Sequence, residues 1–177
     1  MDKAGAQKLL NEWIDSDSLR LHSNMVAQAM EAYANKLGKS EKETLDWYLA
    51  GLLHDLDWEK KPDEHPNYAL ASILPEYSLS NNVLEAIRAH APGRTGKHPE
   101  TEIERYLFAC DEISGFMYAV SLMRPEGFNG MKPKSVKKKL KDKRFAANVS
   151  RQDIQEGLEL IDTTFEDHII FLVEVFK

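Results

Sequence analysis

Hydrophobic residues recur along the chain at the three- and four-residue intervals of amphipathic α-helices. In residues 17–37 this spacing continues until Gly38, which is a natural helix stop. Ser40 and Glu43 then match the pattern of a capping box, so a second helix is expected to begin there. Its apolar positions continue at helical spacing as far as Leu53. This part of the chain therefore predicts two consecutive helices.

The rest of the chain is also predicted to be helical. Residues 57–67 contain two prolines and several charges, and residues 91–99 contain two glycines and two prolines, so both segments are expected to be loops. Further helices are expected at residues 68–74, 81–90, 100–123, 135–141, 152–161 and 165–176. No segment alternates between apolar and polar residues as a half-buried strand does. The pattern predicts an all-α helical bundle.

The composition agrees with one folded domain. The chain has 177 residues, of which 42% are hydrophobic and 29% charged, enough to bury a core. No apolar run approaches the roughly 20 residues that span a bilayer, and residues 1–10 lack the apolar segment of a signal peptide. Cys110 is the only cysteine, which excludes an internal disulfide and a cysteine-rich zinc site. We therefore expect a cytoplasmic protein with no membrane partner.

The net charge of −6 is unevenly distributed along the chain. Residues 132–144 hold eight lysines and arginines and one acid, whereas the rest holds 15 basic and 28 acidic residues. An acidic body repels the phosphate backbone, so nucleic acid is not an expected partner. We interpret the basic segment as a solvated helix face or loop. An RNA-associated hydrolase guided by this segment is the alternative.

Several ionisable residues fall on helix faces that should be buried. His22 and His90 lie on the apolar faces of their predicted helices, and Asp111 shares a face with apolar residues. His54 and Asp55 end a segment that is apolar all round. A buried carboxylate costs several kcal/mol unless it is paired or bound to a metal. Asp55 also opposes the dipole of the helix that it follows. A bound cation would neutralise the buried carboxylate and would also offset its unfavourable interaction with the helix dipole.

Each of these residues also has an ordinary structural explanation when taken alone. A single histidine on an apolar face is more often a hydrogen-bonded core residue than a ligand. We interpret His168 in that way, although the sequence offers no partner for it, and we interpret His98 as a surface residue. Asp111 alone could cap a helix or pair with a lysine. The site hypothesis rests on the combination, since several buried imidazoles and carboxylates would need separate explanations.

The order of these residues resembles the HD superfamily of metal-dependent phosphohydrolases. His22 comes first, the adjacent pair His54-Asp55 follows, and Asp111 comes much later. Residues 51–58, Gly-Leu-Leu-His-Asp-Leu-Asp-Trp, look like the end of that family's central helix. The segment Asp-Glu-Ile-Ser-Gly that begins at Asp111 resembles the one that carries its last ligand.

The resemblance covers about residues 18–125. It implies a single HD-like domain over residues 1–177, in which C-terminal helices at about 133–177 pack on the HD core. The fold it implies is an all-α bundle of the HD-domain type. A homodimer is left open.

The resemblance implies a metal site. His22, His54, Asp55 and Asp111 would bind one divalent transition metal. Their imidazoles and carboxylates suit Mn, Fe, Ni, Co or Zn, so the donor set does not identify the metal. In the binuclear branch of the superfamily, additional histidines hold a second ion and the aspartate of the pair bridges the two. The candidate metal ligands are therefore His22, His54, Asp55, His65, His90 and Asp111.

One departure from the family pattern leaves the second ion open. The diguanylate-phosphodiesterase members have two adjacent histidines at the fourth ligand position and a Gly-Tyr-Pro signature. Here Ala91 follows His90, and that signature is absent. Cyclic dinucleotides are therefore poor substrate candidates. If one ion binds, His65 and His90 become candidates for substrate contact or proton transfer. We favour two ions.

The resemblance implies hydrolysis of a small phosphate ester, with a nucleotide as one candidate. A metal-bound hydroxide would attack phosphorus, and Asp55, His65 and His90 are the candidate catalytic residues. Arg94, between two glycines, is the first choice for contact with the substrate phosphate. Asp57 is interpreted as a solvated loop acid, as is Glu64.

Two further alternatives remain open. The superfamily includes mixed-valent di-iron oxygenases with a similar order of six ligands, which iron content and oxygen uptake would distinguish. In the second alternative the protein is a non-catalytic binding or sensing module, and its metal ions have only a structural role. In that case metal removal would lower the melting temperature, and no phosphate ester would be turned over.

Overall fold

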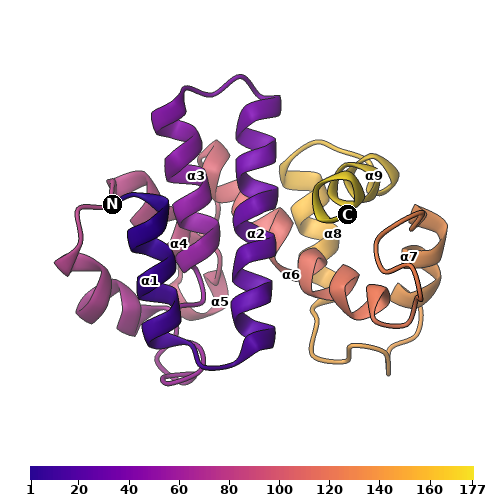
Figure 1. Ribbon diagram of the computed structural model, residues 1–177, viewed down its shortest axis with the longest axis horizontal. Helices are drawn as coiled ribbons and strands as arrows, with labels where there is room; N and C mark the ends of the chain where they lie inside the picture. Colours follow the sequence, from indigo (N-terminus) through magenta and orange to yellow (C-terminus); the bar gives the residue numbers. More distant parts are fainter.

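The computed structural model describes residues 1–177 and contains helices joined by turns, with no β-strand (Figure 1). The all-α prediction is confirmed. The elements in chain order are α1 (Lys3–Trp13), α2 (Asp17–Lys36), α3 (Glu41–Leu53), a π-helical turn η1 (Ala69–Ile73), a 3₁₀ turn η2 (Leu74–Glu76), α4 (Asn81–Ala89), α5 (Pro92–Thr95), α6 (Glu102–Ser121), α7 (Pro133–Leu140), α8 (Arg151–Leu160) and α9 (Phe165–Phe176).

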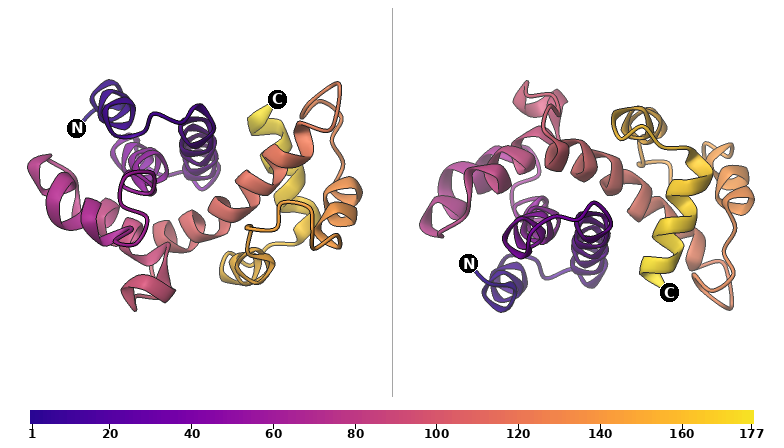
Figure 2. Two further views of the ribbon diagram at one scale, coloured as in Figure 1. Left: turned by 90° about the horizontal axis from the view of Figure 1, so that it is seen from below. Right: turned by 90° about the horizontal axis from the view of Figure 1, so that it is seen from above.

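Two groups of helices pack on the long helix α6. Helices α2 and α3 lie side by side, α1 packs against α3, and α4 packs against both α3 and α6 (Figure 1). Helix α6 extends from this group to α7, α8 and α9 at the C-terminal end (Figure 2). One hydrophobic core of 36 buried residues includes side chains from both groups. Helix α6 is thus the shared support of the N-terminal and C-terminal helices.

Polar caps fix the starts of the helices that carry the candidate site. The Ser16 hydroxyl accepts a hydrogen bond from the backbone N–H of Leu19 at 3.4 Å and caps α2. The Ser40 hydroxyl accepts from the N–H of Glu43 at 3.3 Å, and the Glu43 carboxylate accepts from the N–H of Ser40 at 3.0 Å. The predicted capping box is therefore confirmed, and it sets the start of α3.

A glycine allows α2 and α3 to approach closely. A Cβ atom at Gly51 would lie 2.8 Å from the Cα of Ala27 and 2.9 Å from the carbonyl carbon of Val26. Only a residue without a side chain fits such a contact between two backbones. The contact lies one turn before His54 and one turn after His22, and it brings these two histidines together.

Some helices differ from the sequence predictions. Helix α1 was not foreseen, although Ala6, Leu9 and Leu10 form its buried face and Asp2 caps it. The helix predicted at 68–74 is a π-helical turn followed by a 3₁₀ turn. The loop predicted at 91–99 contains the single helical turn α5. The loop predicted at 57–67 is confirmed as a series of turns as far as Pro66, but Asn67 already belongs to the helical segment that leads into η1.

The helices of this protein do not have the length and apolar character that a membrane span requires. The longest, α2 and α6, have 20 residues each, and both carry several charged side chains.

Candidate metal centre

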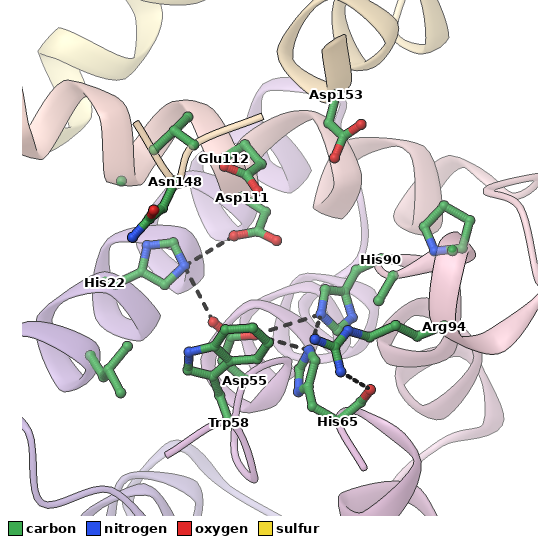
Figure 3. Close-up of a pocket in the computed structure, with 16 residues that line it drawn as sticks. His22, Asp55, Trp58, His65, His90, Arg94, Asp111, Glu112, Asn148 and Asp153 are labelled. Carbon is green, nitrogen blue, oxygen red and sulfur yellow. Dashed lines mark hydrogen bonds and ion pairs between the residues drawn. The ribbon is translucent and has the colours of Figure 1, made fainter. Parts of the chain in front are cut away.

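The ionisable residues selected from the sequence meet around one cavity of about 570 Å³ (Figure 3). They come from α2, the turn after α3, the loop before η1, the end of α4 and the middle of α6. Five of the six candidate ligands line the cavity: His22, Asp55, His65, His90 and Asp111. The sixth, His54, is fully buried directly behind it.

Three side chains surround His22 on one side of the cavity. Its Nε2 lies 3.0 Å from Asp111 Oδ1 and 3.3 Å from His54 Nε2. His54 Nε2 is in turn 3.4 Å from Asp55 Oδ2. Four potential ligand atoms from α2, the turn after α3 and α6 therefore converge, although these three segments are far apart in sequence.

A second pair of histidines lies on the other side of Asp55. The Nε2 atoms of His65 and His90 are 3.1 Å apart. Asp55 Oδ1 lies 3.4 Å from the first and 3.6 Å from the second. Asp55 thus presents Oδ1 to this pair and Oδ2 to His22 and His54. Figure 3 draws its contacts with His22, His65 and His90.

Hydrogen bonds at Nδ1 orient three of the imidazoles. His54 Nδ1 lies 2.8 Å from the Gly51 carbonyl, and His90 Nδ1 lies 2.6 Å from the Ile87 carbonyl. A carbonyl oxygen can only accept, so both Nδ1 atoms carry the proton and donate it. His65 Nδ1 donates in the same way to Asp57 Oδ1 at 2.7 Å. In its neutral form, each of these three rings therefore presents an Nε2 lone pair to the cavity.

The arrangement of these lone pairs shows whether the residues fit a metal ion. Between His65 and His90 two Nε2 lone pairs face each other at 3.1 Å, an arrangement that needs a cation against them. Two sets of three side chains each have ligand atoms within 4.8 Å of one another, and Asp55 belongs to both sets. Imidazole nitrogens with carboxylate oxygens are the donors that divalent transition metals prefer. The residues fit such an ion.

The charges in the cluster also favour a cation. Burial opposes a charge on His54, but Asp55 and Asp111 outweigh burial and raise its pKa well above the usual range. Burial likewise opposes ionisation of the two carboxyls. The surrounding imidazoles, His54 first, outweigh it and hold the pKa of Asp55 and that of Asp111 well below their usual range. The site therefore keeps two carboxylates anionic inside a largely buried cluster.

The comparison with known families agrees with this geometry. The family model for the HD domain matches residues 20–115. The chain belongs to the HD domain family. The matched range begins before His22 and ends after Asp111, so it contains all six candidate ligands. No curated protein and no solved structure gives a match.

Membership of the HD family supports the broader part of the sequence interpretation. HD domains bind divalent metals and are in general metal-dependent hydrolases. The His/Asp cluster of this chain is compatible with that chemistry. The structure brings the six candidate ligands together, and their assignment as ligands stays a prediction.

Arg94 lies at the rim of the cavity on α5 (Figure 3). Its Nη1 donates to the Pro62 carbonyl at 2.6 Å, and its guanidinium lies over the Trp58 ring at 5.1 Å from the centroid. Nε and Nη2 make no hydrogen bond within the protein, so they are available to a ligand. The expected contact with a substrate phosphate stays a prediction.

The structure corrects the sequence interpretation of Asp57. Asp57 is not a solvated loop acid, because it is fully buried and accepts hydrogen bonds from His65 Nδ1 and from the N–H of Ala69, each at 2.7 Å. The interpretation of His168 as a hydrogen-bonded core residue is confirmed, since it is buried and its Nδ1 lies 2.5 Å from the Tyr33 hydroxyl. The interpretations of Glu64 and His98 as exposed residues are confirmed.

Sequence reasoning missed the part of the cavity that comes from beyond residue 125. Asn148, Val149 and Asp153 line the cavity beside Glu112. Burial, followed by the nearby Asp111 carboxylate, raises the pKa of Glu112 to about 7. The adjacency of Glu112 to Asp111 was the only signal in the sequence, because nothing indicated that the segment around residue 148 would fold back on α6.

Proposed function

We propose that this protein is a metal-dependent phosphohydrolase that acts on a small phosphate ester and uses two metal ions. The observation that carries the proposal is the position of Asp55, with one carboxylate oxygen toward each of the two sets of histidines. A carboxylate shared in this way is suited to bridge two cations. Mn, Fe, Ni, Co and Zn all match the donor set.

The proposed ligands divide into two sets. His22, His54 and Asp111 would hold the first ion with Asp55, and the pair His65 and His90 would hold the second with the same Asp55. When bound, such ions lower the pKa of a coordinated water toward neutrality and stabilise charge on phosphoryl oxygens.

The chain's own groups would orient the ester. Arg94 has two nitrogen atoms available and lies on the same rim as His65, where it can donate to phosphate oxygens. Asp57 holds His65 in the tautomer that presents Nε2. These contacts support a substrate with an exposed phosphate group at this rim.

Phosphate release from a panel of phosphomonoesters and phosphodiesters tests this proposal. The protein is purified without chelator and supplied with each of the five metals in turn. We expect turnover of at least one ester, and a loss of about 1,000-fold or more in Asp55→Asn, because the shared carboxylate is removed. The exposed Asp63→Asn in the neighbouring loop is the matched control.

Three outcomes would contradict the proposal. Asp55→Asn could turn over esters as fast as the wild type. Oxygen uptake by iron-loaded protein on an alcohol without phosphate would identify an oxygenase. A fall in melting temperature on metal removal, with no ester turned over, would identify a binding or sensing module.

A further inference from the structure

The cavity has two chemically different sides. Trp58 and Arg94 lie on one side, next to His65 (Figure 3). Glu112, Asn148 and Asp153 lie on the opposite side, beyond Asp111 in the same view. We refer to Glu112, Asn148 and Asp153 as the acceptor wall. Asn148 and Asp153 come from the part of the chain after the family match, which ends at residue 115.

The acceptor wall offers oxygen atoms that the protein leaves free. Glu112 Oε2 accepts one hydrogen bond, from the N–H of Ser150 at 3.1 Å, and Oε1 has no partner. The side chains of Asn148 and Asp153 make no hydrogen bond or ion pair within the protein. No lysine or arginine lines the cavity except Arg94 on the opposite side. The wall is therefore rich in hydrogen-bond acceptors and has no cation of its own.

One half-buried arginine holds the segment that completes this wall. The Arg151 guanidinium donates to the carbonyls of Ala146 at 2.5 Å and Val149 at 2.7 Å, and also to that of Phe145. It also lies over the Phe116 ring of α6, 5.1 Å from the centroid. Residues 145–149 thus fold around a guanidinium anchored on α6. Arg151 therefore holds the acceptor wall in place, so the wall is more than a loose group of acidic residues.

We propose that the acceptor wall selects the alcohol part of the substrate, and that this part is uncharged and carries hydroxyl or amino hydrogens. The proposal rests on the proposed function in taking a phosphate ester as the ligand. The phosphate lies toward Arg94, and the hydrogen-bond donors of the alcohol part lie against Glu112, Asn148 and Asp153.

The selection follows from charge and hydrogen bonding. Donors on the alcohol part satisfy the free oxygens of the wall, whereas a second anionic group there faces two carboxyl side chains with no lysine or arginine side chain beside them. Esters with an additional carboxylate are therefore rejected. The cavity of about 570 Å³ is within the range of roughly 300–1,000 Å³ that small ligands occupy, so it has room for an ester of this kind.

Binding of matched ester pairs by isothermal titration calorimetry tests this inference. One pair is uridine 5′-monophosphate and orotidine 5′-monophosphate, and the other is glucose 1-phosphate and glucuronic acid 1-phosphate. In each pair the second ester carries one extra carboxylate. We expect the wild-type protein, loaded with metal, to bind the first ester of at least one pair about tenfold or more tightly than the second.

The double variant Glu112→Gln/Asp153→Asn keeps the shape of the wall and removes its charge. We expect it to reduce this preference to about threefold or less, with the same metal content as the wild type. The exposed Glu159→Gln on the same helix α8 is the control and keeps the preference. A wild-type preference near one in both pairs, a double variant that keeps the full preference, or no binding of any of the four esters would overturn the inference.

This experiment separates the inference from the proposed function. A preference that disappears in the double variant, with no ester of any panel hydrolysed, would uphold the acceptor wall and contradict the phosphohydrolase. Hydrolysis of both esters of each pair with equal efficiency would uphold the phosphohydrolase and overturn the acceptor wall.

Discussion

Asp57 determines how His65 faces the cavity. Its two oxygens accept from His65 Nδ1 and from the N–H of Ala69, and both contacts are buried. An asparagine has one acceptor oxygen and cannot serve both donors. Asp57→Asn should therefore leave His65 poorly oriented and weaken binding of the second ion by about 10- to 100-fold.

Metal titration against a chromophoric chelator measures that change. The first ion should bind as in the wild type, because its ligands do not contact Asp57. Glu64→Gln, an exposed neighbour in the same loop, is the control. Unchanged affinity for both ions in Asp57→Asn would show that the hydrogen bond to His65 has no part in metal binding.

His168 is a buried histidine with a structural role. Its Nε2 donates to the Ala109 carbonyl at 3.2 Å, and its Nδ1 accepts from the Tyr33 hydroxyl. Burial lowers its pKa to about 4 from an ordinary value of 6.5. The unfolded chain therefore binds the proton more readily, so the free energy of unfolding is highest above pH 6.5 and falls as the pH drops toward 4.

His168→Gln removes this titration and keeps a donor and an acceptor. Urea unfolding at pH 7 and pH 4.5 should show a smaller loss of stability on acidification in the variant than in the wild type. The difference should be at most about 3 kcal/mol, from about 1.4 kcal/mol per pKa unit. Equal losses in both proteins would mean that His168 is not held neutral by the fold.

At the residue scale, the sequence identifies side chains better than it identifies their partners. His22 and His90 could be selected because they interrupt apolar stripes, and their positions in the structure agree. Asp57 could not be separated from a solvated acid, because its partner His65 is in an irregular loop. Tyr33 is 135 residues from His168 and the sequence contains no sign of the contact.

At the element scale, the packing of α2 on α3 determines whether the two halves of the first metal set meet. Gly51 is the point of closest approach, where a Cβ would lie 2.8 Å from the Ala27 backbone. Gly51→Ala should push the helices apart and lower the free energy of unfolding by about 1–3 kcal/mol. It should also weaken metal binding, since His22 and His54 move apart.

Chemical denaturation and metal titration of the same samples check both effects. Gly93→Ala is the control, because a Cβ there would meet no atom within 4 Å. Wild-type stability and metal affinity in Gly51→Ala would contradict the close packing of the two helices.

Helix boundaries followed from local chemistry where caps were present. The Ser40 and Glu43 box was readable in the sequence because both partners lie within one turn. Helix α1 carries similar local signals, the Asp2 cap and a buried face that includes Leu9, so its position too is encoded locally in the sequence. The fold-back of residues 145–149 onto α6 depends on Arg151 and Phe116, a contact that no local pattern encodes.

At the scale of the whole molecule, α6 joins the two groups of helices and supplies both the last candidate ligand and the first residue of the acceptor wall. Asp111 faces the HD core, whereas its neighbour Glu112 accepts from Ser150 in the C-terminal segment. The all-α fold was predictable because helical periodicity extends over most of the chain. The shared cavity was not, because it depends on how the two groups pack on one helix.

The central claim is that Asp55 joins two metal sets in one cavity. The most direct measurement is the metal content per chain, by elemental analysis of protein purified without chelator, for the wild type and for His65→Ala. We predict about two ions per chain in the wild type and about one in the variant. One ion in both proteins, or none in the wild type with any of the five metals supplied, would contradict the account.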